Sequence, residues 1–397
     1  MLMKLVRSIL VVVQIPMAAL VLYLDALSLA ALLWRRAPAP APARARFAIL
    51  IPAHDEELLL AHLLESLAAL EYPRALYSVH VVADNCADGT AAAATAGGAA
   101  MYERRDESRR GKGYALRYLF ERLREGGVDV DAYIVVDADS VVSPTFLAAM
   151  NRRLARGDEV IQAYYGVLNS DESWPAALRY VALALYNGLR PRGRDALRLS
   201  TGLRGNGMCF AAAILDRFGW DAFSLAEDAE FHLRLVEEGL KVSYAPEAIV
   251  LAEMPSSLRA SRSQNVRWER GRLQLLRRFG PRLLADGLRR RDFVRLDAVA
   301  EQLVPPLSLL TGLATLTFAV AVALRARAAR RLATAIALGQ VLYVIIGLRL
   351  VDANARTYAA LLFSPLYVMW KIGVYIAAAT GLGDTRWVRT ARARRKE

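Results

Sequence analysis

Long uncharged runs of hydrophobic residues lie near both ends of the chain. Ser8–Leu33 spans 26 residues with one charge, Asp25, whereas about 20 apolar residues suffice to cross a bilayer as a helix. A cleaved signal peptide is the competing interpretation, but its apolar stretch is only about 7–15 residues long. Three further runs follow, with Lys371 as their only charge: 302–324, 332–348 and 358–383. The pattern predicts a retained N-terminal membrane helix and two or three C-terminal spans.

The middle of the chain alternates short β-rich runs with helical stretches. This order is typical of an α/β domain whose mostly parallel sheet is connected by crossover helices. The clearest strands are Phe47–Ile51, Ser78–Ala83 and Tyr133–Val136. The helices between and after them are predicted at Glu56–Leu70, Gly113–Arg124 and Pro144–Arg156.

Acidic residues follow each of these strands. Pro52–Glu57 comes after the first, Asp84–Thr90 after the second and Asp137–Ser140 after the third. Ligands of open α/β sheets bind outside the carboxyl ends of the strands. The three segments therefore predict the rim of one pocket.

Asp137 and Asp139 have the most specific chemistry. Side chains at i and i+2 of an extended segment point to the same side, so both carboxylates can face one hard cation such as Mg²⁺ or Mn²⁺. Such an ion bound to a diphosphate neutralises the charge that develops on a departing nucleotide. The pair predicts a divalent metal site for a diphosphate ligand.

A separate acidic pair, Glu227 and Asp228, opens a helical stretch over 229–238. Stabilisation by the helix dipole is an ordinary reason for such residues. Group transfer to a hydroxyl nevertheless requires a base that does not hold the metal. The pair is therefore a candidate for that base.

A basic segment over 255–295 contains Gln264, Arg267 and Trp268, which share one face of a helix. Arginine suits phosphate oxygens, tryptophan a sugar ring and glutamine hydroxyl groups. The segment holds 12 arginines against Glu269, Asp286 and Asp292, which is also typical of a helix on a membrane surface. Both interpretations can hold for one helix.

Composition excludes other classes of protein. The 52 Lys and Arg against 39 Asp and Glu give a net charge of +13. These cations gather beside the membrane segments, which argues against a nucleic-acid partner. The only two cysteines, Cys86 and Cys209, form neither a disulfide framework nor a zinc-ligand cluster.

Together these motifs resemble the membrane-bound family 2 glycosyltransferases, which include cellulose, chitin and hyaluronan synthases. Over residues 46–275, Pro52–Glu57 resembles Pro-x-x-Asn-Glu-Glu, with Asp55 in place of asparagine. Asp137 and Asp139 match the metal-binding Asp-x-Asp. Glu227-Asp228 matches Thr-Glu-Asp, with Ala226 in place of threonine. Gln264, Arg267 and Trp268 match Gln-x-x-Arg-Trp in full.

The resemblance implies a Rossmann-like GT-A fold (the fold of nucleotide-diphospho-sugar transferases) and an inverting single displacement. Asp228 is then the general base, and Asp137 and Asp139 are the metal ligands. The remaining expected roles are donor binding and acceptor binding. Donor contacts are expected from Glu57, Asp84, Lys112, Asp137, Gln264, Arg267 and Trp268, and acceptor contacts from Gly205, Asn206, Glu227 and Trp268.

The expected donor is a nucleotide sugar, UDP-linked, and the acceptor a glycan or a lipid. Polysaccharide or envelope-glycan synthesis is the preferred function. The alternatives are addition of one sugar to a lipid such as a polyprenyl phosphate or a ceramide-like molecule, and a non-catalytic nucleotide-sugar sensor or scaffold. Retention of every motif carboxylate argues against the last alternative.

The expected location is the plasma membrane, with membrane lipids as partners. Four arginines between Trp34 and Phe47 place the catalytic domain in the cytoplasm by the positive-inside rule. If 302–324 is re-entrant or interfacial, both the basic loop 325–331 and the basic tail 386–396 also stay inside. The expected segments are an N-terminal span (1–36), a linker (37–45), the GT-A domain (46–254), basic interfacial helices (255–301), C-terminal spans (302–383) and a basic tail (384–397).

Overall fold

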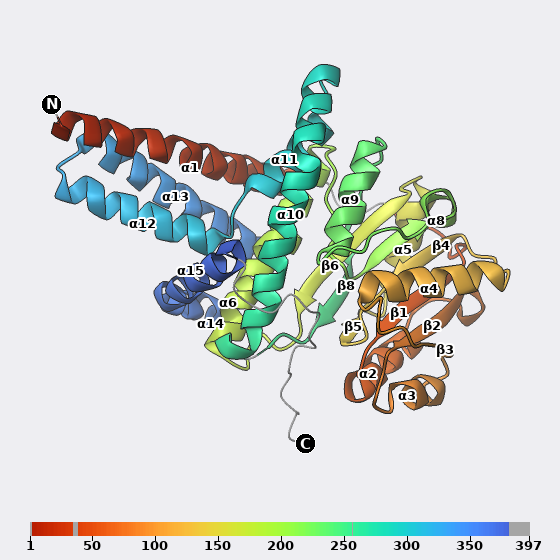
Figure 1. The fold of residues 1–397 in the computed structure, drawn as a ribbon. Coiled ribbons are helices and arrows are strands. Elements are labelled where there is room, and N and C mark those ends of the chain that lie inside the picture. The colour runs from red at the N-terminus through yellow and green to blue at the C-terminus, as the bar shows by residue number, and fades with distance from the viewer. Residues whose placement is uncertain (1, 35–38, 256, 381–397) are drawn as a thin grey trace.

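The computed structural model describes residues 2–34, 39–255 and 257–380 (Figure 1). A sheet with helices on both faces lies on one side of the long helix α10 (Leu258–Arg290). A group of apolar helices lies on the other side. The expected basic tail (384–397) falls outside the described residues.

Eight strands form one sheet in the order β3-β2-β1-β4-β7-β6-β8-β5. They are β1 (Phe47–Ala53), β2 (Tyr77–Asp84), β3 (Ala100–Arg104), β4 (Ala132–Val135), β5 (Ser140–Val142), β6 (Val160–Val167), β7 (Met208–Ala211) and β8 (Ser243–Ala252). The half made of β3, β2, β1 and β4 is parallel. However, β7 is antiparallel to both its neighbours and β5 is antiparallel to β8. Because β6 and β8 are also parallel, four of the seven strand pairings are parallel, and the sheet is mixed where the sequence predicts a mostly parallel one.

Helices cover both faces of the sheet because alternate residues of each central strand point to opposite sides. One face is covered by α2 (Glu57–Ala68), α3 (Thr90–Ala96) and α5 (Phe146–Ala155). The other is covered by α4 (Lys112–Glu125), α8 (Ala212–Phe218) and α9 (Glu227–Glu237). The three strands and three helices predicted from the sequence are all present, with ends shifted by a few residues.

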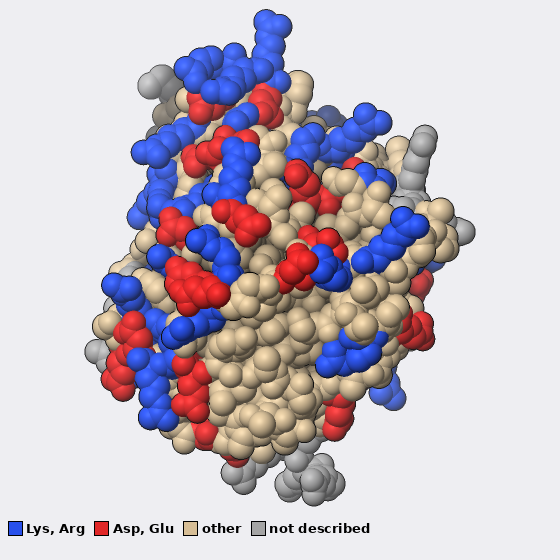
Figure 2. Space-filling view, turned by 90° about the vertical axis from the view of Figure 1, so that its right-hand side faces the viewer, with Lys and Arg blue, Asp and Glu red and all other residues tan. Residues whose placement is uncertain are grey.

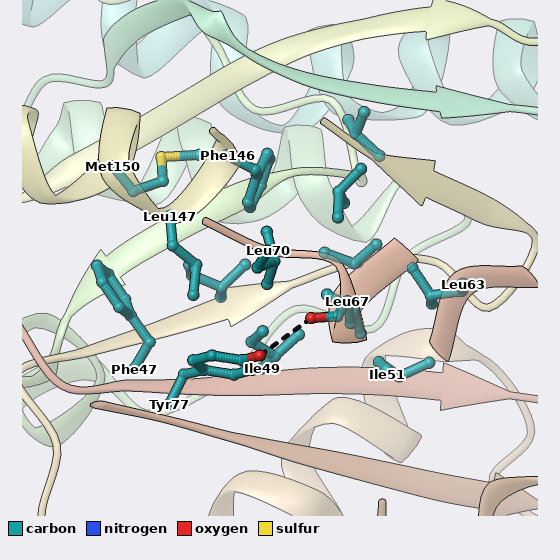
Figure 3. Packing of buried hydrophobic residues seen from close by; sticks show 14 of the residues in the cluster. Phe47, Ile49, Ile51, Leu63, Leu67, Leu70, Tyr77, Phe146, Leu147 and Met150 are labelled. Carbon is teal, nitrogen blue, oxygen red and sulfur yellow. Dashed lines mark hydrogen bonds between the residues drawn. The ribbon is translucent and has the colours of Figure 1, made fainter. Parts of the chain in front are cut away.

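The core beneath β1 fixes the position of the strand end that opens into the site. Figure 3 shows Phe47, Ile49 and Ile51 of β1 facing leucines of α2 and the apolar side of α5. The Tyr77 hydroxyl donates to the Leu67 carbonyl oxygen at 3.1 Å. Each fully buried leucine or phenylalanine contributes roughly 1.5–3 kcal/mol. The strand therefore has little freedom to shift beneath the site.

Five helices form the apolar group. They are α1 (Leu2–Leu32), α12 (Leu307–Ala323), α13 (Arg327–Leu350), α14 (Ala355–Ala360) and α15 (Ser364–Thr380). Three segments of the described chain are long and apolar enough to cross a membrane: Met3–Leu32, Arg327–Leu350 and Ala355–Thr380.

A fourth span is formed if α11 (Phe293–Leu303) and α12 count as one helix bent by 66°. The bend lies at Pro305-Pro306, which cannot continue a helix. Arg7 donates to the carbonyl oxygen of Leu324 at 2.9 Å, so the end of α12 meets the beginning of α1. Figure 1 shows this end away from the sheet. Helix α12 thus extends away from the sheet alongside α1, and the bent pair fits either a broken span or a re-entrant segment.

Helix α10 runs across the inner ends of α1, α12 and α13 (Figure 1). Its exposed arginines include Arg277, Arg278, Arg282, Arg289 and Arg290. Figure 2 shows positive side chains crowded over the upper part of one face of the molecule, with acidic groups among them. Figure 2 looks at the sheet side of the molecule, so the cations seen there face away from the apolar helices.

Three shorter segments connect the sheet to the apolar helices. They are α6 (Trp174–Leu183), a π-helical turn over Ala184–Leu189 and α7 (Arg190–Ala196). Single π-helical turns interrupt α-helices most often at functional sites. Single-turn 3₁₀ helices occur at Arg74–Leu76 and Leu361–Phe363.

Candidate active site

One cavity of about 1310 Å³ begins at the carboxyl ends of β1, β2 and β4. Its wall includes His54 and Glu56 after β1, Asp84 at the end of β2, and Asp137 and Asp139 after β4. The cavity continues past α10 and reaches between α12, α13 and α15. The three acidic strand ends therefore share one pocket rim, as the sequence predicts.

Asp84 is held by a buried arginine at the first end of the cavity. Arg104 donates to the Asp84 carboxylate at 2.6 Å, and both side chains are buried. Burial raises the pKa of Asp84 above its ordinary value, although Arg104 acts against this shift. The pairing fixes the carboxylate at the edge of the cavity, where it can accept hydrogen bonds from a ligand.

The segment that carries Asp137 and Asp139 is anchored by Asn206. The Asn206 side-chain oxygen accepts from the Asp137 backbone N–H at 3.1 Å, and its amide donates to Ser140 at 2.8 Å. Asn206 is fully buried and does not line the cavity. Its side chain therefore holds the Asp137–Ser140 segment in place.

Lys112, at the start of α4, lies between the acidic groups. Its ammonium donates to the Asp137 carboxylate and to the Gly205 carbonyl oxygen, and it lies 3.9 Å from Glu227. Burial alone would lower the pKa of Lys112, but Asp137 and Glu227 raise it above its ordinary value. Lys112 thus stays charged in the centre of the site.

A close backbone contact positions the start of α4. A Cβ atom on Gly113 would lie 2.2 Å from the Ala222 carbonyl oxygen, so only glycine fits there. Gly205 faces the same region with a φ of 79°, and a Cβ atom added to it would lie 3.3 Å from the Asp228 carboxylate. The Gly205 backbone therefore approaches the acidic pair closely.

Glu227 and Asp228 begin helix α9 at the cavity wall. Burial raises the pKa of both carboxyl groups, and their mutual repulsion raises that of Glu227 further, to about 7. Lys112 acts in the opposite direction on both. A buried carboxylate whose pKa is raised toward neutrality is suited to accept a proton.

The three residues of the predicted α10 motif, Gln264, Arg267 and Trp268, all line the cavity. Burial lowers the pKa of Arg267, whereas the carboxylates of Glu227, Asp137 and Asp228 raise it. Arg267 therefore faces the acidic cluster. Helix α10 contributes a cation and an indole to the wall opposite the strand ends.

The structure brings together most of the predicted site residues, with two exceptions. Glu57 is exposed and accepts from the Gly89 backbone N–H at 2.5 Å, so it supports the loop after β2 and does not line the cavity. Its neighbour Glu56 lines the cavity instead. Asn206 is the second exception, because its side chain forms hydrogen bonds with the Asp137–Ser140 segment. Glu57 is the first residue of α2, and from there its side chain reaches the loop after β2 and not the cavity.

Six basic residues that were not assigned to the site from the sequence also line the cavity: Arg110, Arg179, Arg190, Arg204, Arg272 and Lys371. Arg204 follows the segment after α7, and it lies within 3.5 Å of Glu301. Lys371 donates to the Asn265 side-chain oxygen at 2.6 Å. A charge within a membrane segment is the one sequence signal that singles out Lys371, and nothing local distinguishes Arg179 and Arg204.

The oxygen-rich part of the cavity suits a hard divalent cation. Asp137, Asp139, Glu227 and Asp228 face it together with Lys112 and Arg267. Carboxylate oxygens are the ligands that Mg²⁺ and Mn²⁺ prefer. A separate group of Asp55, Cys86 and Asp88 has metal-ligand spacing among the described residues.

Residues 43–271 match the family model described as glycosyltransferase like family 2. The chain is 25% identical over 249 residues to the probable glycosyltransferase YdaM of Bacillus subtilis, covering 59% of this chain and 57% of that protein. It is 27% identical over 177 residues to the probable glucomannan 4-beta-mannosyltransferase 3 of Oryza sativa subsp. japonica, covering 44% and 32%. The matched segment thus spans from a third to somewhat over half of these relatives.

Among solved structures, the chain resembles the mannosyltransferase PcManGT from Pyrobaculum calidifontis, determined in complex with GDP-Man and Mn²⁺. The TM-score is 0.52 at 18% identity, and the match covers 92% of this chain and 98% of that chain. At this identity the likeness concerns the fold.

Proposed function

The chain belongs to glycosyltransferase family 2, and from this premise we propose that it transfers a sugar from a nucleoside-diphosphate donor to a hydroxyl group at the membrane surface. The main support is the single cavity into which Asp84, Asp137, Asp228 and Arg267 all open. At the strand ends the cavity wall carries the acidic and basic side chains that suit a metal-bound diphosphate. The opposite end of the cavity lies among the apolar helices. Donor and acceptor can therefore approach from opposite ends.

The reaction is a single displacement with inversion. Asp84 receives hydrogen bonds from the nucleoside part of the donor, and Lys112 and Arg267 bind the diphosphate. Asp228 accepts the proton of the acceptor hydroxyl, whose oxygen attacks the anomeric carbon from the face opposite the diphosphate. Gly205, Glu227 and Trp268 orient the acceptor, and Trp268 also contacts the donor sugar.

Asp137 and Asp139 would hold Mg²⁺ or Mn²⁺. The ion, when bound, neutralises charge on the diphosphate. Lys112 already contacts Asp137, so it must yield part of this contact to the ion or move onto the phosphate. Asp139→Ala should weaken nucleotide binding in the presence of Mg²⁺, and equal binding with excess chelator would contradict a metal-dependent donor site.

Replacement of the proposed base tests the function directly. Asp228→Asn should reduce transfer roughly 10²–10⁴-fold. Nucleotide binding should persist, because the asparagine amide has nearly the same shape as the aspartate carboxylate. The matched control is Asp216→Asn on the exposed side of α8. Full transfer activity in Asp228→Asn would refute the assignment. Wild-type protein that binds nucleotide sugars without any transfer would instead support the sensor alternative.

The donor is best identified with a panel of nucleotide sugars. The names of similar proteins mention mannosyl transfer and GDP-Man, so GDP-mannose joins the UDP-linked sugars that the motifs alone favour. Thermal-shift measurements on the detergent-solubilised chain with Mg²⁺ and Mn²⁺ identify the donor as the nucleotide sugar that stabilises most.

We place the catalytic domain on the cytoplasmic side of the plasma membrane. Helix α1 runs toward the sheet at its C-terminal end, and four arginines follow it in the sequence before Phe47, which supports this orientation. A protease added to sealed inside-out vesicles should then digest the catalytic domain, and protection there would reverse the orientation.

A further inference from the structure

The active-site cavity continues into the group of membrane helices. Beyond α10 its wall is formed by α12, α13 and α15, and it includes Leu307, Ala314, Phe318, Ala337, Val341 and Ile345. We call this part of the cavity the apolar passage. A donor with a nucleoside and a diphosphate fills the polar end and has no group that suits hydrocarbon walls.

The apolar passage is open on the side of the lipid. Phe318, Val341 and Ile345 line it, yet they are 41%, 53% and 44% exposed. These side chains belong to helices that can cross a membrane or are bent parts of such a span. Exposed apolar residues at that position contact lipid chains. A molecule can therefore enter the passage sideways from the bilayer.

Arg179 of α6 lies where the passage joins the catalytic part of the cavity. It is only 4% exposed, and it donates to the Gln264 side-chain oxygen at 3.2 Å, which belongs to the α10 motif. On its other side lie Met254 and Tyr367 of α15. The buried guanidinium thus faces the junction between the membrane part and the catalytic part.

Among the described basic residues of the cavity wall, only Arg179 and Arg267 form no ion pair with a described carboxylate, and Arg267 has the acidic cluster near it. Lys371 lies 3.3 Å from Glu269, and Arg190 and Arg204 each lie 3.5 Å from Glu301. Burial lowers the pKa of Arg179. An arginine remains charged in proteins, and a buried charge without a counter-charge is costly. An anionic ligand would supply the missing counter-charge.

We propose that the acceptor is a membrane lipid in which a phosphate group joins a long hydrocarbon chain to a hydroxyl-bearing head group. The chain lies in the apolar passage, the phosphate binds Arg179, and the head-group hydroxyl reaches Asp228. This inference rests on the proposed transferase function and names its acceptor. Phosphatidylinositol and a sugar linked to a polyprenyl diphosphate share this chemistry.

The reaction balances without a further reactant. The head-group hydroxyl gives its proton to Asp228, and its oxygen forms a bond to the anomeric carbon. The bond between that carbon and the diphosphate oxygen breaks, and its electron pair leaves with the nucleoside diphosphate. Growth of a free polysaccharide would not require a long apolar wall, whereas apolar side chains are the larger group in this passage; Thr311 and Gln340 also line it and form a hydrogen bond with each other.

The test uses the full-length chain in nanodiscs with a labelled nucleotide sugar and four acceptors offered separately. These are phosphatidylinositol, a polyprenyl-diphosphate-linked sugar, a neutral diacylglycerol glycoside and a free oligosaccharide. We expect label in one of the first two, which identifies the lipid source. Equal labelling of the neutral lipid, or labelling of the oligosaccharide alone, overturns the proposal.

Variants then test the two parts of the acceptor site. Arg179→Gln should raise KM for the phosphate-linked lipid by roughly tenfold or more, because a charged hydrogen bond is lost. Arg179→Lys should restore part of the lost affinity.

Ala337→Trp should reduce the use of a long-chain acceptor at least roughly tenfold more than that of a short-chain analogue. Leu342→Trp, five residues along α13 at an exposed position outside the cavity wall, is the control. An unchanged KM in Arg179→Gln, or equal loss for both chain lengths, contradicts the site.

Binding of the labelled nucleotide sugar is measured in every preparation, and it separates the two levels of failure. Absent donor binding together with absent transfer refutes the proposed function itself. Intact donor binding with transfer to neither phosphate-linked lipid refutes only the lipid acceptor.

Discussion

Two adjacent carboxyl groups, Glu227 and Asp228, are buried together at the start of α9 beside Lys112. Burial raises the pKa of each, and that of Glu227 reaches about 7. A base must be ionised to act, so transfer should fall as the pH falls through the pKa of the pair. This acid limb of the pH profile should lie at a higher pH than the range in which ordinary exposed carboxyl groups titrate.

The charge of Glu227 makes a specific prediction about this limb. Glu227→Gln removes the member of the coupled pair that titrates at higher pH, so only Asp228 still titrates there and the acid limb of kcat/KM should move to lower pH. The profile is normalised to its own plateau, because the substitution also changes an acceptor contact. A limb that stays in place or moves to higher pH would mean that another group titrates. The exposed pair of Arg117 and Glu121 offers Glu121→Gln as a control.

Residues at strand ends could be predicted from the sequence, whereas residues positioned by distant contacts could not. Asp84, Asp137 and Asp228 follow recognisable elements, and the fold brings their neighbourhoods together. Arg179 becomes part of the cavity only because α6 packs near α10 and α15, which no local pattern reveals.

Ala226 also has a distant partner: a Cβ on Gly271 would lie 3.0 Å from the Ala226 methyl group. Two small residues there let α10 approach the catalytic loop.

At the scale of elements, the parallel half of the sheet was predictable, whereas the mixed half, in which β6 and β8 are parallel and β7 and β5 antiparallel to their neighbours, was not. Each strand of β1, β2 and β4 is a β-rich run next to a helical pattern, which predicts parallel pairing. By contrast, β7 has only four residues, and it inserts between β4 and β6 after a long connection. Short buried runs carry no signal of direction, because burial on both faces removes the alternation that would mark them.

The contact between α4 and the loop before α9 gives the prediction at this scale. Gly113→Ala places a methyl group 2.2 Å from a backbone carbonyl oxygen, so the start of α4 must move. We expect a loss of about 1–3 kcal/mol of stability and weaker nucleotide binding, because Lys112 moves with the helix. Gly126→Ala at the other end of α4 is the matched control, since its φ is −75° and its nearest contact is 3.3 Å. Equal donor affinity in both variants would show that α4 does not position Lys112.

At the scale of the whole molecule, a buried network of charges joins the catalytic region to the membrane helices. Arg194 of α7 lies 3.1 Å from Asp297 and 3.3 Å from Glu301 of α11. Tyr23 of α1 donates to Asp297 at 2.8 Å, and Arg190 donates to Tyr343 of α13 at 2.8 Å. Side chains of α1, α11 and α13 thus form one network with α7. The network fixes the sheet above the helices, so that both ends of the cavity stay aligned.

Glu301 is the common partner in this network, and its replacement tests the alignment. It lies within 3.5 Å of Arg190, Arg194 and Arg204. Glu301→Gln keeps the shape but leaves buried guanidinium groups short of negative charge, which costs about 3–5 kcal/mol when a buried pair is broken. The apparent Tm in detergent should fall by several degrees. Glu121→Gln should change stability by less than about 1 kcal/mol, because its partner Arg117 is half exposed. If both variants melt alike, the network contributes no net stability, and the two parts of the molecule must be held together by apolar packing.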